Sequence, residues 1–263
     1  MSEDVTKNPS GVQAVCFVVE AMAVLDEADK AGLTRPEDQP KLAELRGRIA
    51  LGISSDRGAQ EALNRLLAAG AAAKMALDAT TQVFVPGDVI ELRALDPAAG
   101  GGVSLCGRLD YPQERAALET FICDRNGFQN LYVGVDPRRA DMAGLAKAGS
   151  AADVVAFRSI ALDFDKKDGP PADPDWTRTV AELKALDPAL IVNSGNGVQV
   201  WFRVDAADTE IEATVAPIKA AMATLGADDT SDLPRVMRLP FTVNLPTKTK
   251  RARGNVPCLA VSS

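Results

Sequence analysis

In Ser159-Ile-Ala-Leu-Asp-Phe-Asp165, an apolar side chain occupies every second position. A β-strand with this pattern buries one face and places Asp163 and Asp165 together on the other. Two adjacent carboxylates repel each other unless a divalent cation lies between them, and hard oxygen ligands suit Mg²⁺ or Mn²⁺ better than zinc. The stretch therefore predicts a strand that presents a metal site, although an Asp-x-Asp pair that only caps a turn is an alternative. The alternating apolar residues are Ile160, Leu162 and Phe164.

A second strand-like run, Ser194-Gly-Asn-Gly-Val-Gln-Val-Trp-Phe-Arg203, follows about thirty residues later. In a strand, Gln199, Trp201 and Arg203 share one face, and a polar donor, an aromatic ring and a guanidinium together suit a nucleotide. The glycines do not form a dinucleotide fingerprint or a P-loop, because the third glycine, the following helix and a Gly-Lys-Ser/Thr sequence are all missing. An ordinary hairpin with glycine at positive φ is the other interpretation.

Charge is distributed unevenly along the 263 residues, which carry a net charge of -7. No acidic residue follows Asp232, and removing the six positive charges of that terminal segment leaves -13 for the preceding residues. A basic segment on an acidic body is typical of a protein that contacts polyphosphate or a nucleic-acid backbone locally, and a solvated basic tail is the alternative. The basic residues of this segment are Arg235, Arg238, Lys248, Lys250, Arg251 and Arg253.

The chain contains no histidine, and its four cysteines form no Cys-x-x-Cys pair. This composition argues against a zinc site and against mechanisms that need a catalytic histidine, and it leaves carboxylate-metal chemistry. The acidic start differs from a signal peptide, and the apolar run 12–25 is too short and too polar to span a bilayer. We therefore expect a cytoplasmic protein without a membrane partner.

Helical periodicity dominates residues 11–75, and an Ala/Gly stretch at 68–74 indicates a boundary. Short strands and helices alternate after residue 80, which predicts an α/β or α+β fold with a sheet and layered helices. The predicted strands are 82–85, 89–92, 131–135, 160–165, 191–193 and 198–204, and the predicted helices are 112–123, 176–186 and 211–225.

A third block, Gly226-Ala-Asp-Asp-Thr-Ser-Asp-Leu-Pro-Arg-Val-Met-Arg-Leu-Pro-Phe-Thr-Val-Asn244, follows the first two. Together the three blocks resemble the archaeo-eukaryotic primase (AEP) superfamily, and more closely the primase-polymerase (prim-pol) modules of phages and plasmids. In that family an Asp-x-Asp strand is motif one and Ser-Gly-x-Gly-x-His, sometimes with Gln, is motif two. Motif three is an acidic residue ahead of Arg-x-x-Arg-Leu-Pro-Gly-Thr-x-Asn. The resemblance runs from about residue 78 to the C-terminus, and 87–93 and 131–138 also resemble early strands of such modules.

The resemblance implies an AEP-type core with an RRM-like sheet and flanking helices at 77–263, preceded by a helical appendage at 1–76. It implies two-metal nucleotidyl transfer with Mg²⁺ or Mn²⁺, in which one ion activates the attacking 3′-hydroxyl and the other stabilises the leaving pyrophosphate. Asp163, Asp165 and Asp228 would hold the metals, with Asp229 as a rival to Asp228. The residues implied in binding the nucleotide are Ser194, Gly195, Gly197, Gln199, Arg235, Arg238 and Lys248.

Two positions depart from the family pattern near the nucleotide. Gln199 stands where most members have histidine, so its side chain donates hydrogen bonds but never carries a positive charge. Phe241 replaces the glycine of Leu-Pro-Gly-Thr, and its ring either adds a stacking surface or, if that glycine needs a positive φ, narrows the pocket.

The implied function is synthesis of RNA or DNA primers from nucleoside triphosphates, as a primase, a polymerase or both, in phage or plasmid replication. The template would be single-stranded DNA, and a replicative helicase would act in trans or lie on a C-terminal extension. The alternative is a replication-initiation module that binds nucleic acid without making bonds. The acidic trio favours the enzyme, because a binding module has no reason to keep mutually repelling carboxylates.

Overall fold

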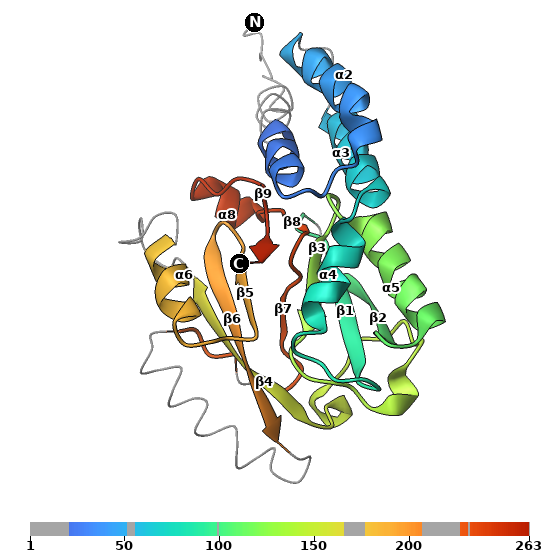
Figure 1. The fold of residues 1–263 in the computed structure, drawn as a ribbon, viewed down its shortest axis with the longest axis vertical. Coiled ribbons are helices and arrows are strands. Elements are labelled where there is room, and N and C mark those ends of the chain that lie inside the picture. Colours follow the sequence, from blue (N-terminus) through green and yellow to red (C-terminus); the bar gives the residue numbers. More distant parts are fainter. Residues whose placement is uncertain are drawn as a thin grey trace, which may run out of the picture.

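The computed structural model describes residues 21–51, 56–98, 100–165, 177–206, 227–230 and 232–262. In these ranges, two four-stranded sheets and a two-stranded sheet pack with helices, and the strands of each sheet pair antiparallel. The fold is therefore α+β, as expected. Figure 1 shows the two larger sheets side by side, with the N-terminal helices at one end of the molecule.

The first sheet has the order β2-β1-β3-β7. Its strands are β1 (Val89–Leu95), β2 (Gly102–Arg108), β3 (Asn130–Gly134) and β7 (Val236–Arg238). Apolar residues of these strands pack with two helices, α4 (Ala72–Thr80) and α5 (Pro112–Arg125), in the largest core cluster. Two short 3-10 helices, Ala140–Met142 and Ala151–Asp153, follow β3.

The second sheet has the order β10-β5-β6-β4. Its strands are β4 (Phe157–Asp165), β5 (Leu190–Asn193), β6 (Gly197–Ala206) and β10 (Val261–Ser262). Leu162, Val198 and Val200 pack in a core cluster with Leu183 of α6 (Thr177–Lys184). Ala161 and Trp201, at alternate positions, pack instead in the core of the first sheet. The predicted alternation is therefore confirmed, and both faces of this sheet are apolar over part of their area.

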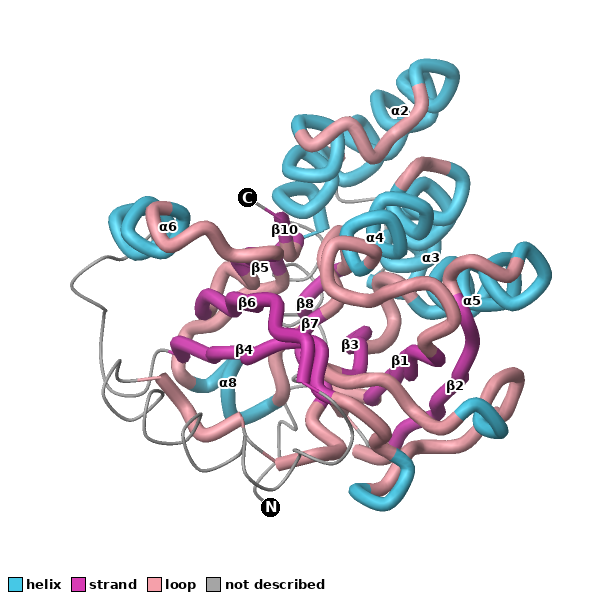
Figure 2. Tube along the Cα trace, turned by 60° about the horizontal axis from the view of Figure 1, so that its bottom comes forward, coloured by secondary structure: helices cyan, strands magenta, loops and turns pink. Residues whose placement is uncertain are grey.

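Strand β7 is the edge of the first sheet, and in both Figure 1 and Figure 2 it lies between the two sheets. A backbone hydrogen bond from Arg238 of β7 to the side chain of Gln199 on β6 joins the sheets. The predicted motifs two and three thus meet at the line where the sheets adjoin.

The N-terminal helices share a core with the C-terminal end of the chain. Helical residues 21–30 are followed by a 3-10 turn (Pro36–Asp38), α2 (Gln39–Ala50) and α3 (Asp56–Ala69). Their leucines pack with Val243, Leu245 and Leu259, which lie in or beside the paired strands β8 (Val243–Asn244) and β9 (Cys258–Leu259). Helix α8 (Lys248–Ala252) follows β8 and precedes β9 along the chain. Helix α4 crosses the predicted boundary at residue 76, and the division into two domains stays a prediction.

One predicted strand is wrong. Residues 82–85 form a turn after α4, in which the N–H groups of Val83 and Phe84 both donate to the carbonyl oxygen of Thr80. The apolar residues Val83 and Phe84 are buried there as part of the core, which accounts for their strand-like pattern. The predicted helix 211–225 lies outside the described residues. Within the described ranges, no helix is both long and apolar enough to cross a membrane.

Candidate active site

Three aspartates from two segments meet at the end of β4. Asp163 pairs with Gln199 and Asp165 with Gly197 in the β4–β6 ladder. The backbone N–H of Asp228 donates to the carbonyl oxygen of Asp163 at 2.7 Å, so Asp228 forms an isolated bridge beside β4. The sequence-predicted carboxylates of motifs one and three are therefore neighbours in space.

Gly197 permits this close arrangement. A Cβ atom at this position would lie 2.6 Å from the carbonyl oxygen of Phe164 and 3.0 Å from Oδ1 of Asp165. Any larger residue would push β6 away from the end of β4 or displace the Asp165 carboxylate. The motif-two glycine therefore has a structural reason that does not depend on a bound phosphate.

The carboxylates influence one another electrostatically. The pKa of Asp163 is raised to about 6, mainly by burial and also by the negative charges of Asp165 and Asp228, against the opposing effects of a hydrogen bond from Gln199 and the charge of Lys250. Asp163 thus lies in a site where negative charge is concentrated and partly desolvated. Such a site is stabilised by a cation.

The donor set fits Mg²⁺ or Mn²⁺, although the described residues hold no group of three or more His, Cys, Asp or Glu side chains arranged to bind a metal by themselves. Mg²⁺ is commonly held by one or two carboxylates together with waters and substrate phosphates, so a complete protein cage is not needed. Asp163 and Asp165 share one face of β4, and Asp228 lies beside Asp163. These three residues would hold the ions.

Gln199 and Arg238 form a buried connection next to the carboxylates. The backbone N–H of Arg238 donates to Oε1 of Gln199 at 2.7 Å. The Arg238 guanidinium donates to three neutral acceptors: Asn130 Oδ1 at 2.9 Å, the Tyr132 hydroxyl at 3.0 Å and Asn244 Oδ1 at 2.8 Å. Burial lowers the pKa of Arg238, which nevertheless keeps its charge because arginine does not deprotonate in proteins. Its positive charge interacts electrostatically with the Asp163 carboxylate.

Hydrogen bonds within the motif-two turn and from the C-terminal segment hold this turn in place. The hydroxyl of Ser194 donates to the carbonyl oxygen of Gly197 at 3.0 Å, and the N–H of Gly195 donates to Asn193 Oδ1 at 2.8 Å. The carbonyl oxygen of Ser194 accepts from Asn244 Nδ2 and from the Cys258 thiol, both at 2.9 Å. The hydroxyl and this amide, which we expected to face a phosphate, are thus engaged within the turn.

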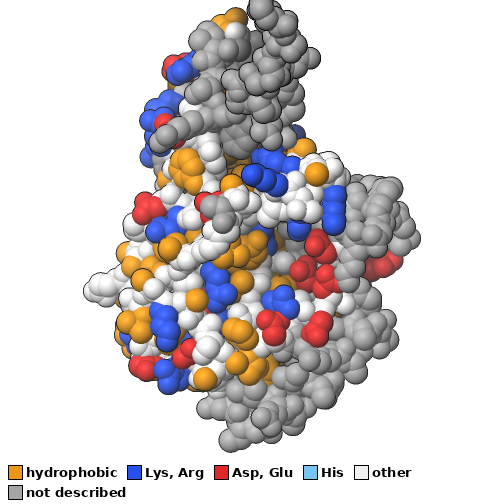
Figure 3. Space-filling model, turned by 180° about the vertical axis from the view of Figure 1, so that it is seen from behind, with side chains coloured by type: hydrophobic (Ala, Val, Ile, Leu, Met, Phe, Trp, Pro, Cys, Tyr) orange, Lys and Arg blue, Asp and Glu red, His pale blue; other side chains and the backbone are white. Residues whose placement is uncertain are grey.

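The basic residues of the terminal segment differ in their positions. Arg235 forms an ion pair with Asp232 and donates to the carbonyl oxygen of Asp229, the exposed rival to Asp228. Lys248 is exposed at the start of α8. Lys250, two residues further on, lies with Nζ 3.6 Å from Oδ2 of Asp165. The structure thus brings Lys250, to which the motifs assign no role, to the carboxylates. The face in Figure 3 shows acidic side chains gathered beside Lys and Arg side chains.

The interpretation of Trp201 as a nucleotide platform is wrong. Its side chain is 1% exposed and packs in the core between the sheets. The strand pattern correctly placed Trp201 on the same face as Gln199, but alternation does not distinguish a face that meets a second sheet from one that meets a ligand.

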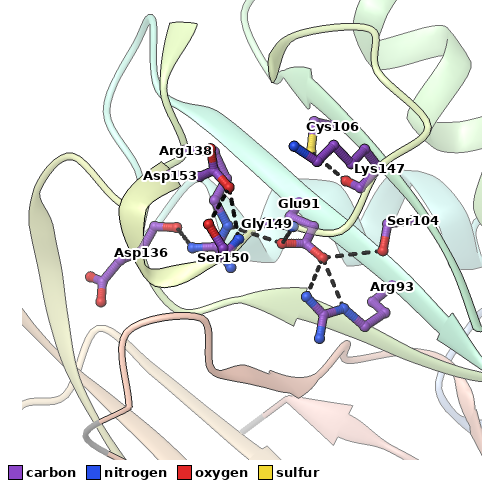
Figure 4. A network of polar contacts seen from close by, with 10 residues as sticks. All are labelled: Glu91, Arg93, Ser104, Cys106, Asp136, Arg138, Lys147, Gly149, Ser150 and Asp153. Carbon is purple, nitrogen blue, oxygen red and sulfur yellow. Dashed lines mark hydrogen bonds and ion pairs between the residues drawn. The ribbon is translucent and has the colours of Figure 1, made fainter. Parts of the chain in front are cut away.

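A polar row that the sequence did not reveal crosses the first sheet toward this site. Ser104, Arg93, Tyr132 and Arg238 are successive partners in the ladders of β2, β1, β3 and β7. In the adjoining network of Figure 4, the fully buried Glu91 accepts from Arg93, Arg138 and Ser104. Its ion pair with the equally buried Arg138 measures 2.9 Å. The row joins strands that are far apart in the sequence. The signal for it in the sequence was the presence of charged residues within otherwise apolar strands.

Comparisons with known proteins return solved structures only, since no protein-family model and no curated protein matches the chain. The primase-polymerase (PrimPol) AEP domain of cyanophage S-2L is 16% identical, over 70% of this chain and 87% of that one, with a TM-score of 0.43. The primase RepB' is 14% identical over 73% of this chain and 56% of its own, with a TM-score of 0.46. The RepB' catalytic domain in complex with initiator DNA is 14% identical over 71% and 83%, with a TM-score of 0.42.

These structures are primases, the proteins that the three motifs resemble. Because identities of 14–16% and TM-scores below 0.5 do not carry a function from one protein to another, we base the functional proposal on the residues of the site.

Proposed function

We propose that this protein is a DNA-dependent primase or polymerase that joins nucleotides by metal-assisted nucleotidyl transfer. The observation that supports this most is the meeting of Asp163, Asp165 and Asp228, from two separate motifs, at the end of one strand. Such a concentration of negative charge is unfavourable for folding alone, and it is expected where cations and polyphosphate bind.

The residues of the chain divide the work between metal and nucleotide. Asp163, Asp165 and Asp228 bind the divalent cations, which supply activation of a 3′-hydroxyl and stabilisation of pyrophosphate. Lys250, whose Nζ lies 3.6 Å from Oδ2 of Asp165, would pair with an incoming triphosphate in place of that carboxylate. Arg235 and Lys248 lie on the same terminal segment and add positive charge toward phosphates or template. The template is single-stranded DNA, and the setting is phage or plasmid replication with a helicase partner.

The test is incorporation of labelled nucleotides on single-stranded DNA with Mg²⁺ or Mn²⁺, with and without a primer. The wild type should give product, and Asp163→Asn should reduce the rate by at least about a thousandfold, because it removes a metal ligand from a two-metal centre. Asp141→Asn is the matched control, since Asp141 is 70% exposed on a different surface element and its change should leave the rate unaltered. Equal rates for Asp163→Asn and wild type would contradict the proposal.

A non-catalytic replication-initiation module is the second candidate. The observation in its favour is that no preformed three-residue metal group occurs in the described part of the chain. Binding of single-stranded DNA by wild type, without any incorporation in either metal, would select this function over the enzyme.

A further inference from the structure

We propose that Gln199 is a positioning residue that orients the Asp163 carboxylate for metal binding by tying it to the backbone of β7. The inference rests on the proposed function only in treating Asp163 as a metal ligand. It assigns to Gln199 a role on the metal side of the site, whereas the motif resemblance assigns it to the phosphates of the nucleotide.

The direction of the Gln199 amide is fixed by chemistry. A backbone N–H can only donate, so the Gln199 atom 2.7 Å from the N–H of Arg238 must be the carbonyl oxygen. The NH₂ group of Gln199 therefore points away from Arg238, and Asp163, its direct cross-strand partner, is the carboxylate next to it on the same face of the sheet. If the amide were flipped, its NH₂ group would face the N–H donor of Arg238, and its oxygen would face the acceptor oxygens of Asp163.

Gln199 and Arg238, the two residues that this hydrogen bond joins, are both held in place by their surroundings. Gln199 is 8% exposed on β6, which pairs with β4 on one side and β5 on the other. Arg238 is 6% exposed, and its guanidinium is held by Asn130, Tyr132 and Asn244. A side chain fixed in this way holds its partner in one orientation, as hydrogen-bonded neighbours of metal ligands do in general.

The same geometry limits what Gln199 can offer to a nucleotide. Its oxygen is used by Arg238 and one of its two amide hydrogens by Asp163, which leaves one hydrogen for any further acceptor. Loss of the amide should therefore affect metal binding more than triphosphate binding.

The experiment is a Mn²⁺ titration of the purified protein, followed through the electron paramagnetic resonance signal of free Mn²⁺. Gln199→Met keeps the length of the side chain and removes both hydrogen bonds, and it should weaken Mn²⁺ binding about tenfold or more, the usual effect of losing a hydrogen-bonded neighbour of a ligand. Gln199→His should stay near wild type, because neutral imidazole offers an acceptor to Arg238 and a donor to Asp163. Gln82→Met makes the same chemical change at an exposed turn position and should bind Mn²⁺ as wild type does.

Thermal melting by circular dichroism identifies a temperature at which each variant is folded, and the titrations are made there. If Gln199→Met does not fold, Gln199→His alone tests the inference, and a tenfold loss of Mn²⁺ affinity in that variant would overturn it. Wild-type Mn²⁺ affinity in Gln199→Met would also overturn it, as would an effect confined to the KM for nucleotide at saturating metal. A wild type that binds Mn²⁺ and responds as expected but incorporates no nucleotide would instead refute the proposed function and leave the positioning role intact.

Discussion

Phe241 has a backbone conformation that favours glycine, and this permits a quantitative test of the turn beside the site. Its φ is +59°, and Phe241 stands where the resembled family has glycine. The turn is held from outside: the N–H of Phe241 donates to the carbonyl oxygen of Ala260 at 2.7 Å, and Asn126 Oδ1 accepts from the N–H of Val243 at 2.8 Å. The side chain is half-buried against two core clusters.

Two substitutions separate the backbone from the ring. Phe241→Ala and Phe241→Gly both remove the packing of the ring, so the difference between them reports the backbone alone. A non-glycine residue at this φ costs about 1–2 kcal/mol, and glycine adds about 0.5–1 kcal/mol of unfolded-state entropy. Phe241→Gly should therefore be more stable than Phe241→Ala by about 0.5–1 kcal/mol.

The assay is urea unfolding followed by circular dichroism, which gives the free energy of unfolding of each variant. The matched control is Phe121, a buried residue of helix α5 with ordinary backbone angles. There the order should reverse, with Phe121→Gly about 1 kcal/mol less stable than Phe121→Ala. A Phe241→Ala protein as stable as Phe241→Gly, or more stable, would show that this turn is not strained and would refute the reasoning.

Three further predictions concern stability. Burial raises the pKa of Asp136 to about 7, so the folded state retains a proton that the unfolded state loses near pH 4. The stability that this group contributes is present below pH 4 and is lost as pH rises to 7, by at most about 1.4 kcal/mol per pH unit. Urea unfolding of Asp136→Asn should therefore show a shallower loss of stability across that pH range. Trp201→Ala should lower the free energy of unfolding by about 3–5 kcal/mol because the ring is core, and a loss below 1 kcal/mol in thermal or urea melts would contradict its burial. Lys250→Met should change stability by less than about 1 kcal/mol, since its ion pair with Asp165 is on the surface, so a larger loss would be inconsistent with this geometry.

Alternation of apolar residues was sufficient to predict the strands that carry the site. Residues 160–165 and 198–204 lie in β4 and β6, and Asp163 and Asp165 share a face as expected. These strands are long enough for the period of two to be read locally. The predicted helix 112–123 also lies within α5.

Elements that depend on distant partners could not be predicted. Strand β2 begins and nearly ends with glycine, and β7 to β10 have two or three residues each, so neighbours in space define them. The turn at 82–85 carries buried apolar residues that resemble a strand. For the site, the resemblance predicted Asp228, which the structure brings beside Asp163. The position of Lys250 beside Asp165 and the burial of Trp201 required the arrangement of the sheets.

The role of Asp163, Asp165 and Asp228 as metal ligands is tested most directly by anomalous scattering from Mn²⁺ in crystals grown with a non-hydrolysable nucleoside triphosphate. We predict an anomalous peak about 2.2 Å from carboxylate oxygens of Asp163 and Asp165, with phosphate oxygens completing the coordination. A triphosphate bound without Mn²⁺ at these aspartates, or Mn²⁺ bound only elsewhere, would contradict the assignment of this site to nucleotidyl transfer.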